Sequence, residues 1–148
     1  MTTAAEPALT EMLLFRVGGE FFALPLARTE EAVESLARDP LPGMPAGMLG
    51  VAEHRGKRIA VYAPAPLFGV SNAERDGVTL LIRADAGRVA LLVDDVEDVI
   101  EMDPAGCRPV PGPAAPDPVL ISVLPCGDKL VAICDADALV RACLGASA

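Results

Sequence analysis

The chain has 148 residues, enough for one domain of ordinary size. Its 21 acidic residues outnumber 12 basic residues, and the net charge of −9 opposes binding to nucleic-acid phosphates and to anionic membrane surfaces. With no Trp, one Tyr and four Phe, the sequence offers no aromatic platform on which bases could stack. The composition therefore argues against nucleic acid as a partner.

The apolar content of 52% is high, but proline, glycine or charged residues interrupt every apolar run. Each run ends before the length of about 18 residues that a membrane-spanning helix needs. The segment 1–10, MTTAAEPALT, lacks the basic start and the apolar run of a signal peptide. We expect 1–10 to be a disordered lead-in and the protein to be cytoplasmic.

The start of the chain has the sequence pattern of a β-hairpin. Two apolar runs, 12–17 and 20–26, are joined by Gly18-Gly19, a two-residue connection typical of a tight β-turn. Pro25 has no N–H to donate, so the second strand should end there or lie at an edge. The sequence therefore predicts a β-hairpin.

The next segment, 27–36, has a different spacing. Thr29, Val33 and Leu36 fall on one side of a helix, with three glutamates on the other sides, which predicts a short exposed helix or wide turn. The segment 39–48 contains three prolines and two glycines and is predicted to be a loop.

A second hairpin is predicted from 49–53 and 58–62, with His54-Arg55-Gly56-Lys57 as a basic turn between them. The segment 63–69, APAPLFG, interrupts the strand pattern. The segment 71–77 is polar and is predicted to be a surface loop.

The stretch Gly87–Met102, GRVALLVDDVEDVIEM, is the one around which we expect the rest to be organised. Val89–Val93 is continuously apolar, and the residues that follow alternate, with Val96, Val99 and Met102 on the side away from water. This predicts one long strand whose first half is fully buried and whose second half is half-exposed. Such a segment is expected where one sheet ends and a second begins, so we predict a β-segment shared by two small lobes.

The strand 78–83 is predicted to pair with the start of that stretch in a third hairpin. The proline-rich segment 107–118, CRPVPGPAAPDP, is predicted to connect the two lobes. A fourth hairpin is predicted from 119–124 and 129–134.

A C-terminal helix is predicted over 135–144, with Asp135 capping its first turn and Gly145 ending it. Many short strands with glycine turns and a single long helix indicate an all-β fold with minor α content, built of small barrels.

Candidate chemical sites are few. Asp94, Asp95 and the acidic residues that follow invite a metal-site interpretation, but neighbouring residues of a strand face opposite ways, and we expect these carboxylates to keep an apolar strand soluble. His54 is the only histidine. An alternative from another class is a small hydrolase or metal-dependent enzyme that uses His54 with the acidic strand. The four cysteines lack CxxC spacing and are expected to be small buried hydrophobes: Cys107, Cys126, Cys134 and Cys143.

No nucleotide-binding or catalytic motif accompanies His54. We therefore expect no catalytic residue, no cofactor and no metal, and a domain that works by binding other proteins.

Five segments in this order resemble the CheW-like family, the chemotaxis coupling proteins and the matching regulatory domain of chemotaxis histidine kinases. The resemblance runs from about Met12 to Leu144. The segments are FFALPL followed by EEAV, then MLGVAEHRGKRIAV, VALLVDDVEDVI, RPVP and KLVAICDADALV.

The resemblance implies two small SH3-like, five-stranded β-barrel lobes packed together as a single domain over 11–145, with 146–148 as a tail. It implies a non-enzymatic adaptor that couples the cytoplasmic tips of chemoreceptors, the methyl-accepting proteins, to the regulatory domain of a CheA-type histidine kinase. The adaptor would be cytoplasmic and recruited to membrane-associated receptor arrays.

The resemblance also implies four partner-binding residues: Glu31, Gly50, Arg55 and Gly56. An arginine at a turn tip can form a bidentate bond to a carboxylate on a partner helix.

The sequence departs from the family pattern near this surface. Glu53-His54 stands where the family usually has Asn-Leu, Ala63-Pro64 where it has Asp-Leu, and Ser122 where a glycine is common. The alternative is therefore a divergent member that has lost one partner and serves another pathway, such as motility or development.

Overall fold

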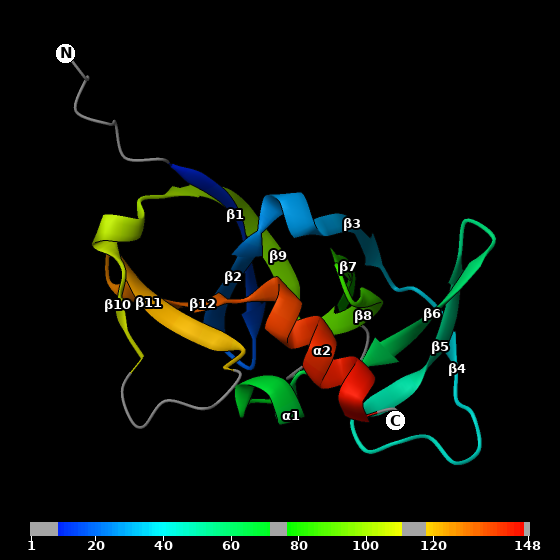
Figure 1. Ribbon diagram of the computed structural model, residues 1–148. Helices are drawn as coiled ribbons and strands as arrows, with labels where there is room; N and C mark the ends of the chain where they lie inside the picture. The colour runs from blue at the N-terminus through cyan, green and yellow to red at the C-terminus, as the bar shows by residue number, and fades with distance from the viewer. Residues whose placement is uncertain (1–8, 72–76, 111–117, 147–148) are drawn as a thin grey trace.

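The computed structural model describes residues 9–71, 77–110 and 118–146, which form two six-stranded sheets curled like barrels (Figure 1). The prediction of a mainly β fold with two barrel-like lobes and a C-terminal helix is confirmed. Each sheet has six strands, where the resemblance implied five. The additional strand in each sheet is only two residues long. No helix in the described ranges is both long enough and apolar enough to span a bilayer.

The first sheet is built from the two ends of the described chain. In spatial order its strands are β10 (Arg108–Pro109), β11 (Leu120–Cys126), β12 (Lys129–Cys134), β2 (Glu20–Pro25), β1 (Thr10–Val17) and β9 (Asp95–Met102). Neighbours are antiparallel except β12 and β2, which are parallel. The predicted hairpins β1/β2 and β11/β12 are confirmed, and β2 ends at Pro25 as expected.

The second sheet is built from the middle of the chain. Its strands in spatial order are β3 (Thr29–Glu34), β7 (Val78–Ala84), β8 (Gly87–Val93), β6 (Lys57–Tyr62), β5 (Met48–His54) and β4 (Arg38–Asp39). The predicted hairpins β5/β6 and β7/β8 are confirmed. Here β6 and β8 are the parallel pair.

The stretch Gly87–Met102 belongs to both sheets, as predicted, but it is two strands and not one. Strand β8 lies in the second sheet, β9 lies in the first, and Asp94 separates them. The buried Asp94 carboxylate accepts a hydrogen bond of 2.7 Å from the backbone N–H of Gly18, and its own N–H donates to the carbonyl of Arg16 at 2.9 Å. The chain is therefore fixed at the crossing by the β1/β2 hairpin.

The predicted alternation along β9 is wrong at Val99. The register between β1 and β9 shifts after Leu14, which pairs with Asp98, whereas Phe15 pairs with Val96. Glu97 is thus an extra residue in a β-bulge, and bulges rotate the side chains that follow. Val99 pairs with Leu13, on the same side as Val96, but it is 43% exposed on this edge strand and is not kept from water as predicted.

The prediction of a short exposed helix or wide turn over 27–36 is also wrong, apart from a turn at its start. A short 3-10 turn, η1 (Leu26–Arg28), is closed by a hydrogen bond of 2.9 Å from the Thr29 hydroxyl to the Leu26 carbonyl, and the edge strand β3 follows it. Side chains of β3 alternate between half-buried and exposed. The β-branched Thr29 and Val33 favour this strand, and its exposed edge accommodates the glutamates.

Two short elements in predicted loops were missed. Helix α1 (Ala65–Phe68) begins after Pro64 and ends at Gly69, whose positive φ of 77° suits a helix C-terminus. Its Phe68 stacks on Phe22 with ring centroids 4.5 Å apart. The second is a 3-10 turn, η2 (Pro104–Gly106).

The proline-rich segment 107–118 does not connect the lobes, contrary to prediction. Strands β9 and β11, before and after it, lie in the same sheet, and β10 within it pairs with β11. Its central part, 111–117, lies outside the described residues, as do 72–76 of the predicted loop and 1–8 of the predicted lead-in.

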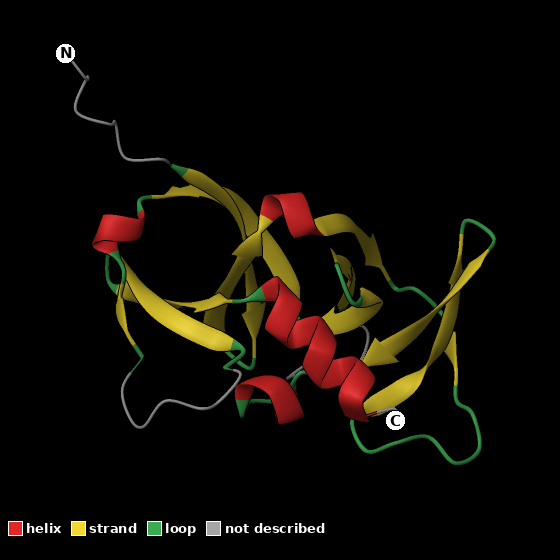
Figure 2. Ribbon diagram, in the orientation of Figure 1, coloured by secondary structure: helices red, strands yellow, loops and turns green. Residues whose placement is uncertain are grey.

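Helix α2 (Ala136–Ala146) covers the second sheet at β7 and β8 and lies between the two lobes in Figure 2. Asp135 caps it as predicted, because its carboxylate accepts from the N–H groups of Asp137 and Ala138 at 2.9 and 3.2 Å. Gly145 lies inside the helix and does not end it. The predicted stop fails because Gly145 does not adopt the positive φ that a glycine uses to end a helix.

The largest apolar cluster joins the two lobes. It combines buried side chains from β1 and β2 with others from β7, β8 and α2, including Phe15, Leu80, Leu91 and Leu139. Smaller clusters fill the inside of each barrel-like sheet. The lobes therefore share one core and are packed as a unit.

The substitution Asp94→Ala should destabilise the fold by about 1–3 kcal/mol, because it removes the hydrogen bond from the Gly18 N–H to a buried, charged carboxylate at the crossing. The measurement is the free energy of unfolding in urea. Glu101→Ala on the exposed face of β9 is the control and should change it by less than about 0.5 kcal/mol. Equal stability of the two variants would contradict the role given to Asp94.

Candidate functional site

Three side chains meet at one end of the second sheet. Glu31 comes from the edge strand β3, His54 ends β5, and Arg55 opens the turn to β6. One carboxylate oxygen of Glu31, Oε2, is hydrogen-bonded to Nε2 of His54. The other, Oε1, accepts from Nη2 of Arg55 at 2.8 Å. A single carboxylate therefore holds both basic side chains.

The turn that presents Arg55 has a defined backbone. Arg55 and Gly56 have positive φ angles of 54° and 77°, and His54 pairs with Lys57 across the hairpin. Two positive φ angles are typical of the type I′ turn, whose twist matches that of the flanking strands. A Cβ atom at Gly56 would meet nothing within 4 Å, so the space beside this glycine is open. The Arg55 side chain is 76% exposed.

A second ion pair lies next to the first. Glu30 receives two hydrogen bonds from Arg88 of β8, 2.6 Å from Nε and 3.2 Å from Nη2. These groups surround a hollow of about 270 Å³, which we name the charged end. Its lining residues are Glu30, Glu31, His54, Arg55, Lys57, Leu81 and Arg88.

The pKa of Glu31 is held below its ordinary value. The hydrogen bond from His54 is the main cause, the nearby positive charge of Arg55 adds to it, and partial loss of water acts in the opposite direction. Glu31 therefore stays ionised throughout the neutral range and remains a fixed negative charge between two basic side chains.

Of the four residues singled out in the sequence, Glu31, Arg55 and Gly56 lie together at the charged end. Gly50 does not. It is buried in β5 with a φ of 151°, and a Cβ atom there would lie 2.7 Å from the carbonyl oxygen of Asp39. Gly50 thus lets β4 pack closely against β5.

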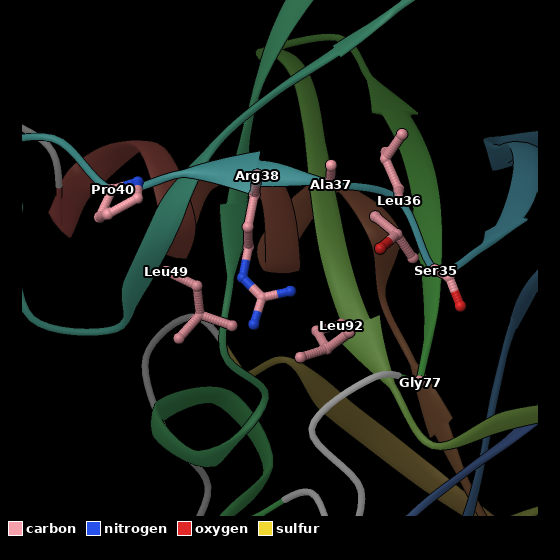
Figure 3. A pocket seen from close by; sticks show the side chains of 9 residues that line it. Ser35, Leu36, Ala37, Arg38, Pro40, Leu49, Gly77 and Leu92 are labelled. Carbon is pink, nitrogen blue, oxygen red and sulfur yellow. The ribbon is translucent and has the colours of Figure 1, made fainter.

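The larger hollow, of about 480 Å³, lies near Gly50 at the opposite end of the same sheet. Strand β8 runs from Arg88 at the charged end to Leu92 in this hollow. Figure 3 shows Arg38 projecting from β4 between Leu49 and Leu92. The inside of the barrel between the two hollows is filled by apolar side chains.

Sequence reasoning missed the contacts of His54, Glu30 and Arg88. The turn chemistry placed His54 and Arg55 correctly, but the predicted helix hid the fact that β3 lies against them. An alternating pattern over Thr29–Glu34 was the available signal, since it places Glu31 on the same side as Val33.

The geometry gives His54 a hydrogen-bonding role, to the carboxylate of Glu31. Within the described ranges no three His, Cys, Asp or Glu side chains are grouped to hold a metal ion. On β9, Asp95 and Asp98 each accept a hydrogen bond from the N–H of the residue that follows. Among the cysteines, Cys134 and Cys143 are buried, and Cys107 and Cys126 are half-buried.

The family model for the CheW-like domain matches residues 11–143. This chain belongs to the CheW-like family. It is 28% identical to a protein named chemotaxis protein CheW from Rhizobium meliloti, over 75% of each chain. It is 29% identical to a probable chemotaxis protein CheW from Rhizobium etli, over 68% of this chain and 66% of the relative.

The fold of this CheW-like chain is similar to the crystal structure of a scaffolding protein, TtCheW, from Thermoanaerobacter tengcongensis. The TM-score is 0.76 with 21% sequence identity, covering 87% of this chain and 90% of that one. The resemblance stated from five short segments is therefore confirmed, together with the architecture it implied.

Gly50→Ala should destabilise the domain by about 2–4 kcal/mol, because the added Cβ would strain the backbone and press on β4. Gly56→Ala, in open space, should lose only about 1 kcal/mol from its positive φ. Urea unfolding of the two variants measures the difference. Equal losses would show that β4 does not require close approach at Gly50.

Alkylation of the folded protein should separate the cysteines into two classes. Burial raises the pKa of the Cys143 thiol to about 12 and also raises the pKa of Cys134, so both should react about a hundredfold more slowly than Cys107 and Cys126. Mass spectrometry of the labelled peptides measures this, with urea-unfolded protein as the control. Rapid labelling of Cys134 in the folded chain would contradict the burial described here.

Proposed function

We propose that this chain is a non-enzymatic, cytoplasmic adaptor of chemotaxis-type signalling. It binds the regulatory domain of a CheA-type histidine kinase and the cytoplasmic tip of a chemoreceptor, and so couples the two. Membership of the CheW-like family over residues 11–143 and the names of the relatives support the chemotaxis setting.

The observation that carries the proposal is the pairing of Glu31 with Arg55. The carboxylate of Glu31 restrains one end of a guanidinium that is otherwise 76% exposed. An arginine has five N–H donors, and the bond to Glu31 engages only Nη2, so other donors are available to a partner. A side chain already held in place loses less conformational freedom on binding.

The other two residues support this surface in different ways. Gly56 leaves open space beside Arg55, so a partner backbone can approach the turn. Gly50 is proposed to act indirectly, because it fixes β4 against β5 and thus the shape of the second lobe. Contacts of this kind are individually weak, and a receptor array would combine many of them.

One observation supports the alternative function, that of a divergent adaptor that has lost one of its two partners. His54, at a position where the family usually has leucine, hydrogen-bonds Glu31 within the proposed contact surface. Binding measured separately with the kinase regulatory domain and with a receptor cytoplasmic fragment distinguishes the two. Binding of both supports coupling, and binding of one alone supports the divergent adaptor.

Arg55→Glu should weaken binding to the chemotaxis-type kinase encoded in the same genome by about tenfold or more, because it places a carboxylate beside Glu31 and removes the donors. The measurement is a pull-down followed by titration of the kinase regulatory domain. The thermal unfolding of the variant should change little, since the side chain is exposed.

The matched control is Arg108→Glu, the same charge change on an exposed residue of β10 in the first sheet. It should bind as the wild type does. No binding by the wild-type chain, or equal binding by Arg55→Glu and Arg108→Glu, would overturn the proposed surface.

A further inference from the structure

We propose that the charged end recognises an acidic surface of its protein partner and that protonation of His54 strengthens this binding. The inference rests on the proposed function, since it names the chemistry and the regulation of the same surface.

The charged end is locally basic on an acidic chain. Its charged groups are Glu30 and Glu31 of β3 on one side and Arg55, Lys57 and Arg88 on the other. With His54 neutral, three positive and two negative groups give +1, whereas the whole chain carries −9. The charged end therefore attracts a partner with exposed carboxylates, whereas the rest of the surface, which is negative on average, repels it.

Glu31 links His54 to Arg55. The two basic side chains bind different oxygens of the same carboxylate. When His54 is protonated, its positive charge offsets the charge of Glu31, and the charged end rises from +1 to +2. Arg55 stays hydrogen-bonded to Glu31, and a carboxylate of the partner then meets its exposed guanidinium with less opposing negative charge beside it.

His54 is suited to this role by its type and its place. It is the only histidine in the chain, and histidine is the side chain whose charge ordinarily changes between about pH 5 and pH 8. Its side chain is 21% exposed, so water and protons reach it. Glu31 stays ionised over the same range because its pKa is lowered.

The expected effect is moderate. One added charge about 7 Å from a partner carboxylate, in surroundings close to water, strengthens binding about three- to fivefold. Salt screens such a charge over about 8–10 Å, so the effect should shrink as ionic strength rises.

The test uses the full chain and the kinase regulatory domain, with dissociation constants measured at about pH 8 and about pH 6 at fixed ionic strength. The wild type should bind about three- to fivefold more tightly at the lower pH. His54→Gln keeps a hydrogen-bond donor but cannot titrate, and any pH dependence it retains belongs to other groups of the two proteins. We expect His54→Gln to lose the gain, and His54→Leu to lose it as well.

A second readout follows the histidine itself. The single imidazole signal followed by NMR should change over the same pH range as the affinity.

The possible failures are distinguishable. Absence of wild-type binding at both pH values overturns the proposed function. Binding that depends on pH equally in wild type and His54→Gln, or that weakens in the wild type as pH falls, overturns the role of His54 and leaves the proposed function standing. Equal affinity of Arg55→Glu and wild type for the acidic partner overturns the assignment of the surface.

Discussion

The structure depends on how one chain passes between two curled sheets while the buried Asp94 at the crossing keeps its hydrogen bonds. The chain passes once through η1, between β2 and β3, and returns at Asp94, between β8 and β9. At the return, the Asp94 carboxylate accepts from Gly18 and the Asp94 amide donates to Arg16, so both polar groups of the crossing are satisfied by the β1/β2 hairpin. The cluster around Phe15 and Leu91 then fills the space between the lobes, and neither lobe can separate without exposing it.

This construction leaves the surface available for function. Apolar side chains fill each barrel and the space between the barrels, and charged side chains lie outside these clusters, along β9 as well as at the charged end. The charged end takes residues from β3, the β5/β6 hairpin and β8, which are distant in sequence but fixed relative to one another by the sheet. Under the proposed function, a scaffold of this kind would hold Arg55 in place before a partner arrives and so reduce the entropic cost of binding.

Local signals were sufficient for the hairpins, the glycine turns and the Asp135 cap, because each depends on a few adjacent residues. They were insufficient for the parallel pairs, since Val131 beside Phe21 and Val61 beside Ala90 depend on closure of whole sheets. In the short segment 29–34, apolar residues fit both the helical and the strand period, and only the pairing with β7 decides for the strand. The Glu31–His54 contact was hidden for this reason, because it exists only when β3 is a strand at the edge of the second sheet.

The residues that shape the turn and those that set its charge are separate. The positive φ angles of Arg55 and Gly56 determine how the turn projects, and His54 contributes no such constraint. An imidazole at position 54 can therefore change the electrostatics of the charged end while the β5/β6 hairpin keeps its geometry. Because Glu31 contacts both His54 and Arg55, a change of charge at the first residue reaches the second through one shared carboxylate, without movement of the backbone. Under the proposed function, such a substitution would alter the affinity for a partner more readily than it alters the fold.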